Sequence, residues 1–122
     1  MRVSFAGHRT DIPEVLSALD IFVHASIDEP FGITIVEAMA AGLPVVATLG
    51  GGVGEIVTDN ETGLLVPPED SDALAAAITR LIEDPLLAKT LSEAARTHAR
   101  LWFSNQRMIA ETTAFIERVA RR

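Results

Sequence analysis

Two short, continuous apolar runs restrict most strongly what this chain can fold into. Residues 21–25 (IFVHA) and 43–48 (LPVVAT) are rich in β-branched residues and lack the polar alternation of a strand with one face in water. Strands of this composition are covered on both faces, as in parallel sheets. Between them, residues 33–41 have the length of a helix, which Gly42 and Pro44 end. We therefore predict a right-handed, mostly parallel α/β sheet.

Further elements are predicted on either side of this unit. Residues 3–6 form an apolar run that stops at Gly7, and residues 64–66 form one that stops at two prolines, so we expect a sheet of about four strands. Apolar residues at helical spacing predict helices that cover the sheet, near residues 12–19, between Asp70 and Pro85, and at 86–100 and 104–121.

The end of the chain carries two predictions about packing. In the last predicted helix, Ser104 is a suitable N-cap, and four side chains are expected to face inward, namely Met108, Thr112, Phe115 and Val119. Trp102 and Phe103 are expected to pack within this helical cover rather than to stack on a base.

Composition and charge disfavour several classes of function. The 122 residues suffice for one domain, and their net charge of −7 disfavours binding to nucleic acid. The chain has no cysteine, and its three histidines lie far apart, so no metal site is expected. No run is long enough to span a membrane and the first residues lack the apolar core of a signal peptide, so we expect a cytoplasmic location.

The stretch from Glu29 to Glu37 is the best candidate for a binding site. Gly32 ends a loop and opens a helix, where unpaired backbone N–H groups can face an anion, although a simple turn glycine fits equally well. Glu37 fits a capping box with Thr34, but it also fits a carboxylate that accepts hydrogen bonds from sugar hydroxyls. Glu29 is either a solvated loop carboxylate or part of the same site.

Two other stretches follow predicted strands and therefore belong at the same edge of the sheet. The glycine run at residues 50–52 includes Gly51 and Gly52, which either contact a ligand or form only a hinge or tight loop. It matches neither the dinucleotide fingerprint nor the phosphate-binding loop. His8 and Arg9 follow residues 3–6 and are possible ligand contacts, whereas His24 is expected to be a packed strand residue.

Taken together, these residues resemble the donor-binding half of a GT-B glycosyltransferase of the large retaining family 4, the glycosyl transferases group 1. The most specific element is the E-x7-E motif from Glu29 to Glu37, with Phe31 and Gly32 inside it. The resemblance extends over almost the whole chain, including FAG at 5–7, PVVA at 44–47, GGVGEIV at 51–57 and TGLLVP at 62–67.

The resemblance implies a nucleoside-diphosphate sugar as the donor substrate and no cofactor or metal. Glu29 is then the catalytic-site residue that contacts hydroxyls of the transferred sugar, and Glu37 holds the ribose hydroxyls. The remaining donor-binding residues of the motif are Phe31 and the helix start, where the backbone amides of Gly32, Ile33 and Thr34 meet the diphosphate. The basic pair that neutralises the diphosphate in such enzymes has no counterpart in this sequence.

The resemblance also implies an incomplete Rossmann-like three-layer domain, in which residues 1–122 form part of the C-terminal nucleotide-sugar-binding domain. The acceptor domain and two strands, which would separate residues 3–6 from residues 21–25, are not represented. We therefore predict that residues 3–6 pair elsewhere, that elements are exchanged with another chain in a homo-oligomer, or that a sheet edge stays exposed. The chain alone is expected to be inactive; the alternative is a non-catalytic module that binds nucleotide weakly or self-associates.

Overall fold

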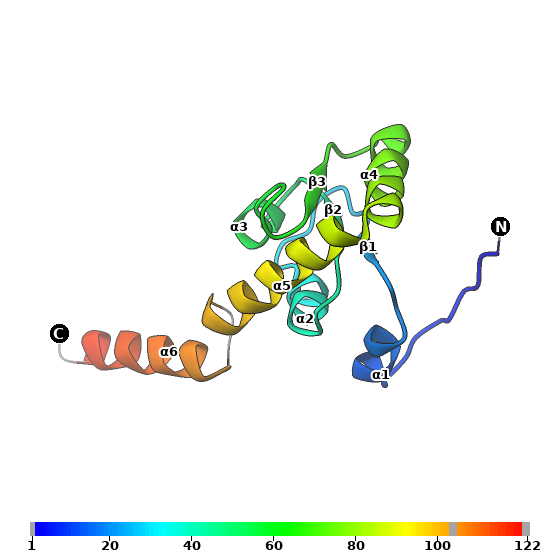
Figure 1. Ribbon diagram of the computed structural model, residues 1–122. Helices are drawn as coiled ribbons and strands as arrows, with labels where there is room; N and C mark the ends of the chain where they lie inside the picture. Colours follow the sequence, from blue (N-terminus) through cyan, green and yellow to red (C-terminus); the bar gives the residue numbers. More distant parts are fainter. Residues whose placement is uncertain (1, 103–104, 121–122) are drawn as a thin grey trace.

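The computed structural model of the chain describes residues 2–102 and 105–120. Nine helices and strands follow one another in the described part (Figure 1): α1 (Ile12–Ser17), β1 (Phe22–His24), α2 (Ile33–Ala40), β2 (Val45–Thr48), α3 (Val53–Ile56), β3 (Leu64–Val66), α4 (Ser71–Glu83), α5 (Pro85–Trp102) and α6 (Asn105–Ala120). None of the described helices is both long enough and apolar enough to cross a membrane.

The three strands form one parallel sheet in the order β1-β2-β3. Phe22 pairs with Val45 at the start of the first ladder, and Val46 pairs with Leu64 in the second. All four residues of β2 are buried, as the continuous apolar run predicts for a central strand. The predicted parallel α/β architecture is therefore confirmed.

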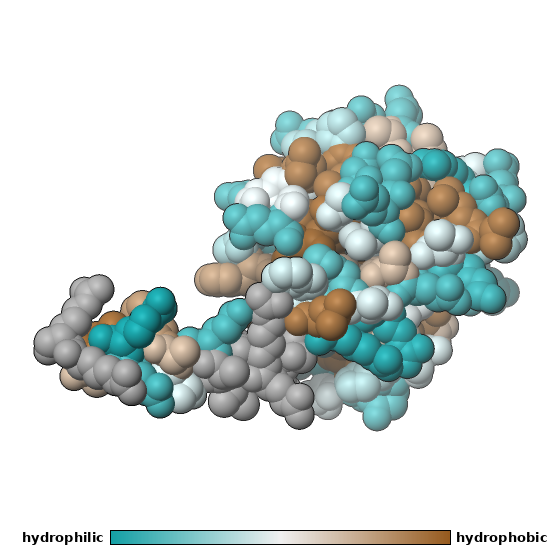
Figure 2. Space-filling model, turned by 60° about the vertical axis from the view of Figure 1, so that its left-hand side comes forward, coloured by the Kyte–Doolittle hydropathy of each residue, from teal (hydrophilic) through white to brown (hydrophobic). Residues whose placement is uncertain are grey.

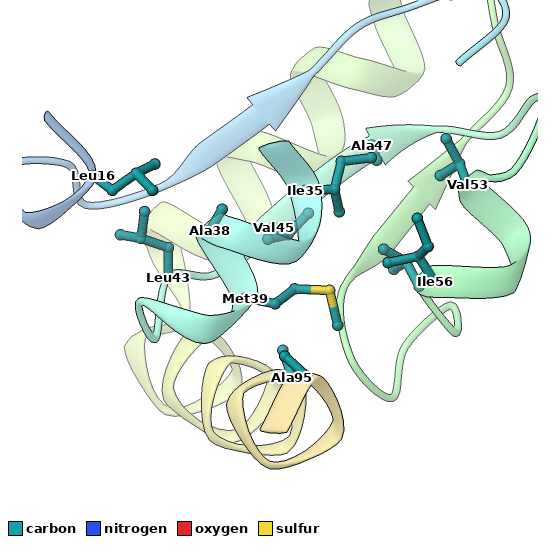
Figure 3. Packing of buried hydrophobic residues seen from close by; sticks show 12 residues of the cluster. Leu16, Ile35, Ala38, Met39, Leu43, Val45, Ala47, Val53, Ile56 and Ala95 are labelled. Atoms are coloured by element: carbon teal, nitrogen blue, oxygen red, sulfur yellow. The ribbon is translucent and has the colours of Figure 1, made fainter. Parts of the chain in front are cut away.

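Helices cover both faces of the sheet and make the predicted three layers. On one face, α2 packs through Ile35, Ala38 and Met39 against the strands and against Ala95 of α5 (Figure 3). On the other face, α4 packs through Ala77 and Leu81. Helix α5 contributes to both clusters, because Leu91 lies in the second and Ala95 and Ala99 lie in the first.

The prediction of a first strand at residues 3–6 is wrong. This segment has no strand pairing; it runs away from the sheet (Figure 1), and Val3 and Phe5 are 69% and 97% exposed. An apolar run becomes a strand only where a neighbouring strand accepts its hydrogen bonds, and within the described residues β1 pairs only with β2. The sheet thus has three strands instead of about four, and β1 is an exposed edge whose Val23 is 38% exposed.

The inward packing predicted for the last helix is also wrong. Helix α6 points away from the rest of the molecule (Figure 1), and Phe115 and Val119 are 58% and 49% exposed, with Thr112 exposed as well. Trp102 is 53% exposed, so it does not pack within the helical cover. The amphipathic pattern is present, but no described element lies against it. Phe103, Ser104 and the side chain of Met108 lie outside the described residues.

Apolar side chains also remain at the surface of the main body. Figure 2 shows hydrophobic residues between polar ones on one face of the molecule. The exposed large side chains include three at the carboxyl edge of the sheet, where the candidate site lies: Ile27, Phe31 and Leu49.

Candidate functional site

The loops that follow β1 and β2 lie against each other at the carboxyl edge of the sheet. The Gly52 N–H donates a hydrogen bond of 2.8 Å to the carbonyl oxygen of Glu29. A Cβ added at Gly50 would lie 2.6 Å from the Ile27 carbonyl oxygen, and one added at Gly52 would lie 2.7 Å from that of Pro30. Gly51 lies equally close to the same loop and has a φ of +53°. The glycine run is therefore a backbone surface on which the Glu29 loop rests.

Thr48 joins the two strand ends beneath these loops. Its side chain is buried, and its Oγ1 donates a hydrogen bond to the carbonyl oxygen of Ser26 and lies 3.4 Å from that of His24. This hydroxyl gives the Ser26 carbonyl oxygen a donor at the point where the ladder between β1 and β2 ends. The start of the Glu29 loop is thus fixed to β2.

Helix α2 begins at Gly32, which has the left-handed conformation with a φ of 64°. A Cβ at this position would be strained at this φ and would lie 2.6 Å from Ile56 Cδ1, so the end of the Ile56 side chain would have to shift. Because the helix starts here, Thr34 is already inside the first turn and the structure shows no side-chain cap. The capping-box alternative for Thr34 and Glu37 is therefore wrong, since that box requires the N-cap at Thr34.

Glu29 is held at the start of this helix by its side chain as well as by its backbone. Its Oε1 accepts a hydrogen bond of 3.1 Å from the Gly32 N–H, and its Oε2 lies 3.3 Å from His24 Nε2. The Gly32 N–H is the main cause that lowers the pKa of Glu29; partial burial raises it, while the Phe31 N–H and His24 lower it further. The carboxylate is therefore an ionised hydrogen-bond acceptor at neutral pH.

The other residues of the motif surround the helix start. Phe31 and Ile33 are 76% and 64% exposed, and Thr34 is exposed. The backbone N–H groups of Ile33 and Thr34 have no intrahelical acceptor, because they belong to the first turn. Glu37 is half-buried one turn beyond Ile33, and within the described residues it forms no ion pair. Its carboxylate is thus available for a ligand.

The structure does not bring His8 and Arg9 to this site. Both are exposed, and the guanidinium of Arg9 donates to the carboxylate of Asp11, with 2.8 Å between Nε and Oδ1. Arg9 lies in a hollow against α1, together with Glu14 and Leu19. Their predicted role as ligand contacts would require a movement of the segment before α1.

A hollow of about 350 Å³ opens beside the site on the α4 side of the sheet. Its polar lining includes Ser26, Thr48, Glu69 and Asp70. None of these residues was predicted from the sequence to line a site, and the contact of His24 with Glu29 was not predicted either. In the described part of the chain, no group of three carboxylate or imidazole side chains is arranged to hold a metal ion.

A parallel sheet whose carboxyl edge carries a glycine loop and a helix start is typical of α/β domains that bind nucleotides. The chain belongs to the family described as glycosyl transferases group 1, whose model matches residues 1–98. Its structural neighbours are GT-B glycosyltransferases. The family and the fold class predicted from the motif are thereby confirmed.

Individual relatives support the same assignment. The chain is 38% identical over 120 residues to a glycogen synthase of Mycobacterium tuberculosis, covering 97% of this chain and 29% of the relative. It is 44% identical over 90 residues to the lipopolysaccharide core biosynthesis mannosyltransferase LpsB of Rhizobium meliloti, covering 71% of this chain and 26% of LpsB. The chain thus spans less than a third of the length of these relatives.

Solved structures of two relatives superpose closely on this chain. The crystal structure of HepE from Anabaena in complex with UDP-glucose matches with a TM-score of 0.85 and 42% identity, over 93% of this chain and 32% of HepE. Sucrose-phosphate synthase from Thermosynechococcus elongatus matches with a TM-score of 0.84 and 38% identity, over 88% of this chain and 27% of the enzyme.

Proposed function

We propose that this chain is the donor-binding part of a retaining glycosyltransferase, which transfers a sugar from a nucleoside-diphosphate sugar to an acceptor. The observation that carries the proposal is the arrangement around the start of α2. There, two glutamates flank a helix start whose first N–H groups are free of intrahelical acceptors. HepE, which is 42% identical, has been crystallised with UDP and with UDP-glucose, so these are the first ligands to test.

The proposed roles follow from what each group has available. Glu29 accepts hydrogen bonds from the transferred sugar, and Glu37 accepts them from the vicinal hydroxyls of the ribose. The N–H groups of Ile33 and Thr34 face the diphosphate, whereas that of Gly32 is already bound to Glu29. Phe31 contributes exposed apolar surface beside them. In line with the family resemblance, no metal takes part.

The charge of the site supports the proposal that this chain does not catalyse transfer by itself. A helix start contributes roughly half an elementary positive charge, which is far less than the charge that develops on a departing nucleoside diphosphate. Both residues proposed to bind the donor sugar and ribose are acidic. The guanidinium of Arg9, in the segment before α1, is paired with the carboxylate of Asp11 and so is not available to neutralise a diphosphate. The missing positive charge must come from another domain or another chain.

Calorimetric titration of the 122-residue chain with UDP, UDP-glucose, GDP and ADP tests the donor site. We expect weak binding of one nucleotide and its sugar, and a loss of roughly tenfold or more in Glu37→Ala, because a ribose hydroxyl pair then loses its charged acceptor. Glu83→Ala, at the end of α4, is the control and should bind as the unmodified chain does. A chain that binds none of these ligands while its circular dichroism shows an intact fold would refute the proposal.

A second role, self-association, is favoured by the free edge of β1. The described residues leave β1 without a strand on its outer side, and residues 3–6 are exposed and apolar. We propose that residues 3–6 of one copy add to the β1 edge of another. Light scattering should show a dimer that Phe5→Asp dissociates, whereas an unmodified chain that is monomeric at high concentration would exclude this role.

A further inference from the structure

His24 occupies a position that packing alone does not explain. Its ring stacks on Phe22 with 6.4 Å between the ring centroids, as expected for a strand residue. Its Nε2 is fully buried, however, and makes no hydrogen bond of ordinary geometry to any described group. Glu29 Oε2 lies 3.3 Å from this nitrogen. A buried ring nitrogen without a partner is unfavourable, so this atom is expected to engage the carboxylate.

The two oxygens of Glu29 are held from different sides. Oε1 accepts from the Gly32 N–H, which leaves Oε2 as the oxygen that His24 reaches. The imidazole donates from Nε2 both as the cation and as the neutral tautomer that carries its proton there. Two donors on one carboxylate fix its plane, whereas one donor leaves it free to rotate.

The backbone of both residues is also anchored. Thr48 Oγ1 lies 3.4 Å from the His24 carbonyl oxygen, and the Gly52 N–H donates to the Glu29 carbonyl oxygen. Among the described residues, Glu29 carries the only carboxylate within ion-pair distance of the imidazole. The contact between the two side chains is therefore set by the strand end and the glycine run.

We propose that His24 is a positioning residue for Glu29, which holds Oε2 so that the carboxylate meets the hydroxyls of the transferred sugar in one orientation. The part of this inference that concerns the sugar rests on the proposed function. The contact itself does not, and it can be measured without a ligand.

Two variants of His24 distinguish the effect of its hydrogen-bond donor from the effect of its aromatic ring. His24→Phe keeps an aromatic ring beside Phe22 but removes the donor, and His24→Gln keeps an uncharged N–H that reaches the Nε2 position. His98→Phe, the same exchange in α5, is the matched control. The titration of the Glu29 carboxyl group, followed by ¹³C NMR, reports whether His24 holds it.

We expect the pKa of Glu29 to rise in His24→Phe, to rise less in His24→Gln and to stay unchanged in His98→Phe, because His24 is one of the groups that lower it. The affinity for UDP-glucose should fall in His24→Phe by roughly threefold to tenfold relative to that for UDP, the range for the loss of one hydrogen bond. His24→Gln should restore much of this difference. UDP serves as the reference because it lacks the transferred sugar.

A Glu29 titration that is the same in His24→Phe as in the unmodified chain would overturn the inference, whatever the ligands do. So would an unchanged ratio of the UDP-glucose and UDP affinities in a chain that binds both. If UDP, UDP-glucose, GDP and ADP all fail to bind the unmodified chain but the Glu29 pKa responds to His24, the hold on the carboxylate is supported and the proposed function is refuted.

Discussion

The substitution Gly51→Ala is expected to disrupt the candidate site through the backbone alone. Gly51 has a φ of +53°, and a Cβ there would overlap the Glu29 carbonyl oxygen and lie 2.7 Å from Asp28 Oδ1. Alanine in the left-handed conformation costs about 1–2 kcal/mol. To relieve the overlap, the two loops must separate and lose the hydrogen bond from Gly52 to Glu29, which adds about 1–2 kcal/mol. We therefore expect a destabilisation of about 2–4 kcal/mol.

Gly42→Ala is the matched control for this prediction. Gly42 also has a left-handed conformation, with a φ of +81°, but the nearest neighbour of an added Cβ is Arg96 Cδ at an ordinary 3.8 Å. This variant should therefore lose only the conformational part, about 1–2 kcal/mol. The difference between the two variants isolates the contact between the loops.

Urea denaturation followed by circular dichroism measures both free energies of unfolding. In thermal denaturation, each kcal/mol corresponds to about 4 °C in a chain of this size. Amide shifts of residues 27–32 should change in Gly51→Ala and stay unchanged in Gly42→Ala. If Gly51→Ala is no more destabilising than Gly42→Ala and leaves these shifts in place, the glycine run does not support the Glu29 loop.

Three further predictions concern stability. Because the pKa of Glu29 is lowered in the folded chain, its ionised carboxylate stabilises the fold at any pH above the ordinary pKa of a glutamate. This contribution is lost as the pH falls through the lowered pKa. In Glu29→Gln, the urea midpoint should therefore fall less steeply as the pH is lowered. Thr48→Val should cost about 1–2 kcal/mol in urea denaturation, because the partly buried Ser26 carbonyl group loses its donor, whereas Thr48→Ser should cost less. Ile35→Ala, at a fully buried position, should lower the free energy of unfolding by about 2–4 kcal/mol. Ile82→Ala, at a position that is 65% exposed, should change it very little. Equal effects of these two variants would contradict the assigned core.

The elements that were predicted correctly are those for which the described chain supplies a partner to pack or pair with. The run that became β2 is followed and preceded by helices that cover it, so its local pattern already reflects its surroundings. Residues 3–6 have a similar apolar pattern, but a strand also needs a neighbour that the pattern does not reveal. For the same reason, the amphipathic face of α6 predicted packing that the described residues do not provide.

The candidate site shows a second limit of local patterns. Thr34 and Glu37 have the spacing of a capping box, but the left-handed Gly32 starts the helix two residues earlier. The partnership of His24 with Glu29 was missed because His24 fits a packed strand equally well. A usable signal was present: His24 ends its strand at the edge where the predicted ligand loop begins, only five residues before Glu29.

Glu29 and Glu37 differ in a way that decides how variants of this motif are to be interpreted. Glu29 is anchored at its carbonyl oxygen by Gly52 and at its carboxylate by Gly32 and His24, so replacing it alters the loop as well as any contact with a ligand. Glu37 lies within α2, and within the described part of the chain its carboxylate forms no ion pair. A loss of nucleotide binding in Glu37→Ala therefore reports on the ligand contact itself. The same loss in a Glu29 variant is informative only when the amide shifts around Gly32 show that the helix start has stayed in place.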